Sequence, residues 1–236
     1  MSYPLYTILG VLPSTIWLIF YLRKDKHPEP KKMVLKIFFY GMLCALPAIF
    51  LETGIIKGTL AIFPSKNLFI QLFNIFIGVA LIEELLKYLV VRDKVLIHPE
   101  FDEPVDLVLY MIISALGFAA LENILILFSL GPIFLLGETF SVSIFRFLGA
   151  TLLHALTSGT LGYFWAISIY ETKRNKYLFT GFFIATFLHG LYNFSIINIR
   201  GTVALLIPAF ILLGLPIFLT FKFKRLKKIK SVCKID

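Results

Sequence analysis

Ionisable and amide side chains recur inside apolar stretches of this sequence, in combinations that suit hydrolysis. The stretch LIEELLKYLV carries Glu83, Glu84 and Lys87 among leucine, isoleucine and valine. The stretches GFAALENIL, HALTSG and FLHGLYNF add Glu122, Asn123, His154, His189 and Asn193. A buried glutamate can take a proton from water, and a histidine or an asparagine can donate to the oxyanion of an attacked carbonyl. These residue types therefore indicate hydrolysis by glutamate-activated water.

A metal-dependent mechanism is equally consistent with these residues. Glu122, His154 and His189 can supply three zinc ligands and leave a fourth position for water. The sequence has no HExxH, and the three residues lie in three different apolar runs. The cofactor is therefore left open between zinc and no metal.

The composition determines which elements must position these groups. The chain has 236 residues, of which 58% are hydrophobic and 16% are charged, and its mean hydropathy is +0.88. These values are typical of multi-span membrane proteins. Runs long enough to cross a bilayer as helices lie at about 4–22, 33–51, 67–91, 105–130, 140–170, 177–198 and 202–221. The sequence thus predicts an all-α, polytopic integral membrane protein with a single domain, a bundle over 1–222 and a basic tail over 223–236.

The basic residues predict the orientation of these spans. Lys and Arg concentrate at 23–32, 92–104, 171–176 and from 222 onward. This pattern places the N-terminus outside and the C-terminus in the cytoplasm, in a cell membrane. The formal net charge is +9, and the tail KFKRLKKIK follows the last span directly. We expect the tail to contact anionic lipid rather than nucleic acid, because no nucleic-acid recognition motif accompanies it.

The polar groups lie on spans three to six, and we expect them to meet in one water-accessible cavity. Ionisable groups in hydrocarbon are costly unless they are paired or face water. Depths counted from the inner ends are roughly 12 Å for Glu83, roughly 18 Å for His189 and roughly 24 Å for His154 and Glu122, so tilt or kinks must close the gaps. Lys87 can snorkel or pair with Glu83, but we expect it not to neutralise both glutamates, since adjacent helical residues point in different directions.

The four motifs, taken in order, resemble the PrsW family of membrane-embedded proteases. EELLK, FAALEN, HALTSG and HGLYN carry the resemblance, which runs from about residue 24 to 193. This family is grouped with the CAAX prenyl proteases and the gamma-secretase scaffold subunit. The resemblance implies proteolysis of a membrane-anchored protein or peptide. The chain departs from a DGxxYG pattern, because Leu107 and Met111 stand in place of its glycines.

The resemblance also implies roles for the candidate residues. By analogy with the prenyl-processing enzymes, Glu83 is the base, and Glu122 and His154 orient water. His189 and Asn193 are then the oxyanion donors, and Glu84 and Asn123 complete the two acidic motifs. Asn193 stands where many members have aspartate, which suits an oxyanion donor and removes one possible metal ligand.

Two functions of other classes remain as alternatives. An ion- or proton-coupled transporter would use the same carboxylates. Such transporters often contain inverted repeats, and here the only similarity between spans is HxxxS in the fifth and HxxxN in the sixth. A non-catalytic scaffold that binds transmembrane helices would not need both glutamates and both histidines.

Overall fold

A computed structural model describes residues 3–23, 28–63, 67–96, 98, 101, 103–129, 136–170, 172–201 and 203–226. The regular elements among these residues are all helical. They are α1 (Tyr3–Leu22), α2 (Lys31–Ile62), α3 (Leu68–Phe73), η1 (Asn74–Leu81), α4 (Ile82–Lys94), α5 (Pro104–Ser129), α6 (Leu136–Leu148), α7 (Ala150–Tyr170), α8 (Arg174–Asn198) and α9 (Val203–Leu226). Helices α3, η1 and α4 form one continuous span, and α6 and α7 form another. Seven segments of the described chain are long and apolar enough to cross a membrane. The prediction of a polytopic, all-α membrane protein is confirmed.

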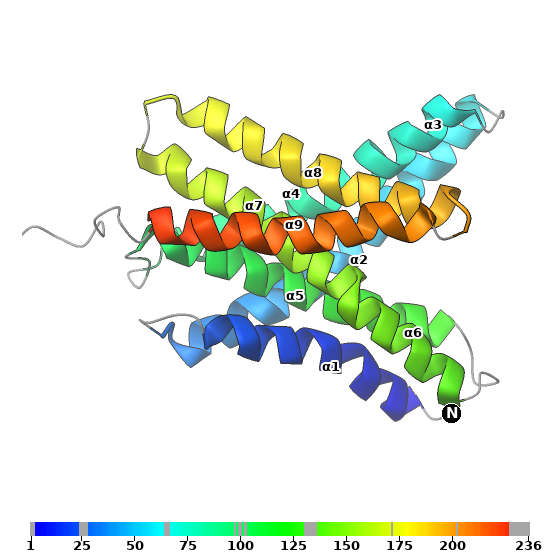
Figure 1. The fold of residues 1–236 in the computed structure, drawn as a ribbon, viewed down its shortest axis with the longest axis horizontal. Coiled ribbons are helices and arrows are strands. Elements are labelled where there is room, and N and C mark those ends of the chain that lie inside the picture. Colours follow the sequence, from blue (N-terminus) through cyan, green and yellow to red (C-terminus); the bar gives the residue numbers. More distant parts are fainter. Residues whose placement is uncertain are drawn as a thin grey trace, which may run out of the picture.

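Helix α5 is the central element of the bundle (Figure 1). It packs against α1, α2 and α7, and its residues are buried over most of its length. The outer helices expose large apolar side chains, as expected of surfaces that contact lipid. A helix in this central position can present polar groups to several neighbours while keeping them out of the acyl chains. Glu122 and Asn123 lie in the second half of this helix.

Glycines allow α2 and α5 to approach each other closely. A Cβ atom on Gly41 would collide with the backbone oxygen of Ser114, and one on Gly117 would collide with the backbone oxygen of Phe38. Backbone atoms cannot rotate out of the way as side chains can. The small residues at this crossing therefore set the helix separation, as is common in membrane proteins.

Helix α2 differs from its predicted span, because it continues beyond residue 51 to Ile62. Hydropathy alone gave an earlier end, since Glu52 and Lys57 lower the local average. The extension places Glu52 inside the helix rather than in an outer loop. Glu52 is thus an ionisable group on a helix outside spans three to six, which the sequence did not lead us to expect.

Two further local features were not predicted. The third span contains the π-helical segment η1, which leads directly into the turn that carries Glu83 and Glu84. A π-helical turn changes the direction in which the following side chains point, and such turns are frequent at functional sites. The fifth span is interrupted at Gly149, where α6 ends and α7 begins.

Figure 1 shows the C-terminal ends of α1, α7 and α9 at the same end of the bundle, as an alternating topology requires. Helix α9 continues to Leu226, past the predicted bundle boundary at residue 222. The rest of the basic tail lies outside the described residues. The predicted orientation and the tail's lipid contact stay predictions.

Candidate functional site

Four helices place ionisable side chains at one buried point of the bundle. Helix α4 provides Glu83, Glu84 and Lys87, α7 provides His154, and α8 provides His189. Each of these five residues is at least 96% buried. Helix α5 provides Glu122 beside them. The predicted convergence of the third to sixth spans is thus present in the structure for these residues.

The ammonium group of Lys87 lies between the two adjacent glutamates. Its Nζ atom is 3.1 Å from Glu83 Oε2 and 3.0 Å from Glu84 Oε1. Lys87 thus contacts both glutamates although their side chains leave the helix in different directions, but its single positive charge does not neutralise two carboxylates. Residues three and four positions earlier both lie on the helix face below a lysine. The long side chains converge although the two Cα–Cβ bonds diverge.

Lys87 also contacts His154 and therefore determines the protonation pattern of its ring. The Nζ atom lies 2.9 Å from His154 Nδ1. Because an ammonium group can only donate, Nδ1 must be the acceptor, and the ring proton is on Nε2. With Glu83, Glu84 and His154 as acceptors, the three hydrogens of the ammonium group are all used. The ring of Phe118 lies below the same cation, 4.4 Å away at its centroid.

A chain of polar contacts holds His154 from its other side. His154 Nε2 lies 2.9 Å from Glu122 Oε2. Arg146 Nη2 lies 3.0 Å from the same oxygen, an ion pair whose alignment falls short of a hydrogen bond. The Nε of Arg146 donates to Asn123 Oδ1. Asn123 in turn donates to Thr151 Oγ1 at 3.1 Å, so helices α5, α6 and α7 are tied together around the ring.

His189 is held in the same way by a different carboxylate. Its Nδ1 lies 3.0 Å from Glu84 Oε1. Ser158 donates to the other oxygen of Glu84 at 2.6 Å, and the Thr157 hydroxyl lies 3.2 Å from Oε1. Both oxygens of Glu84 are therefore occupied by donors, which suits an ionised carboxylate with a positioning role.

Glu83 differs from Glu84 in its free capacity to accept protons. Its Oε2 lies 3.6 Å from His154 Nδ1 and 3.8 Å from His189 Nε2. Its Oε1 forms no hydrogen bond with the described residues. Glu83 is thus the carboxylate of the pair that has an oxygen free for a water molecule.

The donor set fits a zinc-type metal. Glu83, His154 and His189 each present one ligand atom, and these atoms lie within 4.8 Å of one another. One carboxylate and two imidazoles form a donor set used by catalytic zinc. Each imidazole also has its second nitrogen on a carboxylate, the arrangement that orients metal-ligating histidines. Lys87 shares two of the three donor atoms, so its ammonium group and a metal compete for the same position.

This set differs from the zinc ligands considered from the sequence. Glu122 contacts the Nε2 atom of His154, on the side of the ring away from Glu83. Glu83 takes its place in the cluster, because Nδ1 of His154 is the nitrogen that faces Glu83. The sequence spacing could not reveal which ring nitrogen faces which carboxylate.

Two of the predicted site residues lie outside this central contact group. Asn123 is buried and bonds to Arg146, Thr151 and the backbone oxygen of Gly10. Asn193 is half-buried, and no hydrogen bond joins it to the described residues of the site. Its role as an oxyanion donor stays a prediction.

Glu52 is the acidic residue near the site that the sequence analysis missed. One of its oxygens, Oε1, is buried and has no hydrogen-bond partner among the described residues. It lies close enough to Glu83, Glu122 and Lys87 for their charges to affect its ionisation. The signal was its position in an otherwise apolar stretch, AIFLETGII, in which the predicted span ends at residue 51, directly before Glu52.

Comparison with known proteins gives one consistent result. The sequence model of the PrsW family intramembrane metalloproteases matches residues 29–221. The chain is 33% identical over 190 residues to "Protease PrsW" of Geobacillus kaustophilus, covering 80% of this chain and 78% of that protein.

Two further relatives agree with this assignment. "Protease PrsW" of Oceanobacillus iheyensis is 31% identical over 86% of this chain and 88% of its own length. The Bacillus subtilis protein of the same name is 27% identical over 94% of each chain. No solved structure gives a significant match. With most of its length covered by the family model, the chain belongs to the PrsW family of intramembrane metalloproteases.

Proposed function

We propose that Glu83, His154 and His189 are the catalytic residues of an endopeptidase that hydrolyses peptide bonds of membrane-anchored proteins. One observation carries the proposal. Glu83 faces one nitrogen of each imidazole, at 3.6 and 3.8 Å, while the other two ring nitrogens are held by Glu122 and Glu84. The general activity follows from the family, whose relatives are named proteases.

Glu83 is the proposed base for the attacking water. Its free oxygen can accept a hydrogen bond from water and then take a proton when the oxygen attacks the peptide carbonyl. Glu84 is excluded from this role by its donors Lys87, His189 and Ser158, which occupy both of its oxygens. Of the two adjacent glutamates, the first is thus the base and the second is a positioning residue.

The two histidines have distinct positions in the proposed mechanism. Glu122 holds Nε2–H of His154, and Glu84 holds Nδ1–H of His189. Each ring therefore presents a lone pair, rather than a proton, toward Glu83. Lone pairs directed at a common point suit metal binding better than oxyanion donation. The geometry thus favours the metal-dependent alternative over histidine donation to the oxyanion.

Glu83, His154 and His189 are the residues that would hold the metal, with Glu83 using Oε2, the oxygen nearest both rings, so that its free Oε1 stays available to the water. A metal bound there supplies Lewis acidity, which polarises the peptide carbonyl and makes bound water easier to deprotonate. Lys87 must then move its ammonium group away from Glu83 and His154 while keeping Glu84. A lysine side chain has enough rotatable bonds to do so.

The client segment is proposed to approach beside α6. The side chains of Glu83 and His154 are nearly inaccessible to solvent, whereas the side chain of Glu122 is 29% exposed and that of Arg146 is 16% exposed. The polar site therefore opens on the side where α5 and α6 meet. A transmembrane helix must lose local helical structure before its backbone can be attacked, and exposed polar groups at this opening can stabilise the released amide groups.

Cleavage of a defined peptide tests the catalytic assignment. The purified protein in liposomes is given a membrane-anchored peptide, and wild type is compared with Glu83→Gln, His154→Ala and His189→Ala. All three variants should lose at least about 100-fold in kcat/KM, in the range expected for a lost base or metal ligand. Glu103→Gln and His98→Ala are matched controls outside the site and should cleave like wild type. Wild-type cleavage by Glu83→Gln would remove that residue from the mechanism.

Metal analysis tests the mechanism separately. Metal content and cleavage are measured on the same preparations before and after chelation, and then after zinc is restored. The metal-dependent mechanism predicts joint loss and joint recovery, with little metal retained by His154→Ala or His189→Ala. Full activity in a metal-free preparation would instead support glutamate-activated water without a metal.

A further inference from the structure

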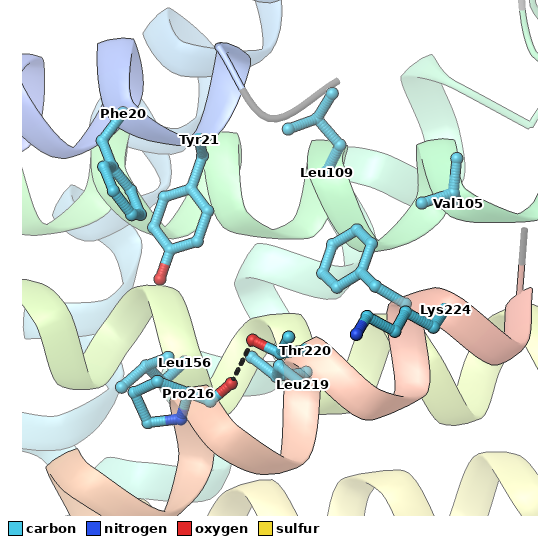
Figure 2. A pocket seen from close by; sticks show the side chains of 10 residues that line it. Phe20, Tyr21, Val105, Leu109, Leu156, Pro216, Leu219, Thr220 and Lys224 are labelled. Carbon is cyan, nitrogen blue, oxygen red and sulfur yellow. Dashed lines mark hydrogen bonds between the residues drawn. The ribbon is translucent and has the colours of Figure 1, made fainter. Parts of the chain in front are cut away.

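A cavity lies between α1, α5, α7 and α9, and Figure 2 shows the side chains that line it. Its volume is about 430 Å³, within the roughly 300–1,000 Å³ range of small-molecule sites. None of the residues of the proposed catalytic group lines it. The proposed protease mechanism gives this cavity no role.

The cavity wall is apolar apart from two donors. Leu109, Leu156 and Leu219 are among the side chains that form the wall. The hydroxyl of Thr220 is not available, because it donates to the backbone oxygen of Pro216 at 2.7 Å, as Figure 2 shows. Figure 2 also shows the Tyr21 hydroxyl and the Lys224 ammonium group directed into the space between the helices. Neither group has a hydrogen-bond partner among the described residues.

The two donors lie at a depth that suits a lipid. Tyr21 is next to the last residue of α1, and Lys224 lies in the last turn of α9. Both are at the end of the bundle that the basic residues predict to be cytoplasmic. That end meets the headgroups of the inner leaflet, where anionic lipids attract basic side chains.

We propose that this cavity binds an anionic phospholipid of the inner leaflet. One acyl chain lies against the leucine wall, the phosphate contacts Lys224, and an ester oxygen accepts from the Tyr21 hydroxyl. A lysine at the mouth complements the phosphate charge, and an apolar interior complements the chain. Since α1 and α9 both line the cavity, the lipid would also link these two helices.

Lipid binding by the whole protein tests the proposal. Phosphatidylglycerol and phosphatidylcholine are titrated separately into delipidated protein in detergent, and bound lipid is counted by native mass spectrometry. Phosphatidylglycerol should bind more tightly at one site. Lys224→Gln should weaken its binding roughly fivefold, as expected for one basic residue at a membrane surface. Thr220→Trp, which fills the cavity from an exposed position, should abolish it.

Lys222→Gln is the matched control. Lys222 carries the same charge two residues away on α9, but its ammonium group lies over the rings of Phe218 and Tyr163, at 5.2 and 5.5 Å. This variant should bind phosphatidylglycerol like wild type, and millimolar inorganic phosphate should not displace the lipid. Equal binding of the two lipids, equal weakening by the two lysine variants, or unchanged binding in Thr220→Trp would overturn the proposal. Unchanged cleavage by each variant verifies that it is folded.

Discussion

Glu84 and His189 form a buried hydrogen bond between α4 and α8, with 3.0 Å between Oε1 and Nδ1. This bond places the ring proton on Nδ1, so the Nε2 lone pair faces Glu83. The carboxylate that directs the ring is thus a different one from the carboxylate that the ring faces. The two adjacent glutamates of one sequence motif therefore lie at different nitrogens of the same ring.

The first prediction compares Glu84→Gln with Glu83→Gln. Glu84 accepts from Lys87, His189 and Ser158, and an amide at this position would place NH₂ against one of these donors. Glu84→Gln should therefore lower the free energy of unfolding by about 3–5 kcal/mol, as for other broken buried ion pairs. Glutamine at position 83 keeps an oxygen for Lys87, and that variant should lose little stability. The measurement is the thermal unfolding midpoint of each purified variant in the same detergent. Equal midpoints would contradict separate roles for the two glutamates.

The second prediction concerns Glu122 as a positioning residue for His154. Glu122→Ala removes the acceptor of Nε2–H and should lower kcat by about 10- to 100-fold with little change in KM. Glu122→Gln keeps an amide oxygen for that proton and should recover most of the lost kcat. Steady-state cleavage of a membrane-anchored peptide gives both constants. If the glutamine variant is as inactive as the alanine variant, the charge of Glu122 takes part in the chemistry.

The helices and most of the residues at the site could be predicted from the sequence, and the reason is simple. A bilayer requires long apolar runs and penalises stray charge, so hydropathy locates the spans and ionisable groups within them mark the site. Glu83, Glu84, His154 and His189 were identified in this way and lie together. The depth estimates had placed Glu83 and His154 on different levels, because helix tilt cannot be read from residue counts.

Other features depend on packing that no single span reveals. The C-terminal part of α2, which follows Glu52, packs against η1, where Thr59 donates to Asn74 Oδ1, and local hydropathy does not reveal this contact. The choice of Glu83 over Glu122 as the third member of the cluster depends on which nitrogen of His154 faces α4. Asn193 shares a helix row with His189, yet the shared row does not bring it into contact with the other site residues.

The third prediction tests the crossing of α2 and α5. Gly117→Ala places a Cβ against the backbone of Phe38 and Met42, so the helices must separate. The expected cost is about 1–3 kcal/mol, typical of overpacked cores, with lower cleavage activity because α5 carries Glu122. Gly54→Ala on α2 is the control, since nothing lies within 4 Å of a Cβ there. Reversible unfolding in mixed micelles measures both. Equal stability of the two variants would contradict the close crossing.

The last prediction concerns Lys87, whose ammonium group serves Glu83, Glu84 and His154 together. Lys87→Met leaves two buried carboxylates without their cation and should cost about 3–5 kcal/mol. Lys87→Met and Glu84→Gln both break the same ion pair, so part of their cost is shared. The loss of unfolding free energy in the double variant should therefore be smaller than the sum of the two single losses by about 1–3 kcal/mol. The four unfolding free energies give this coupling directly. The methionine also stops competing for Glu83 and His154, so Lys87→Met should bind zinc at least as tightly as wild type. Additive losses together with weaker zinc binding would show that Lys87 supports the metal site rather than competing with the metal.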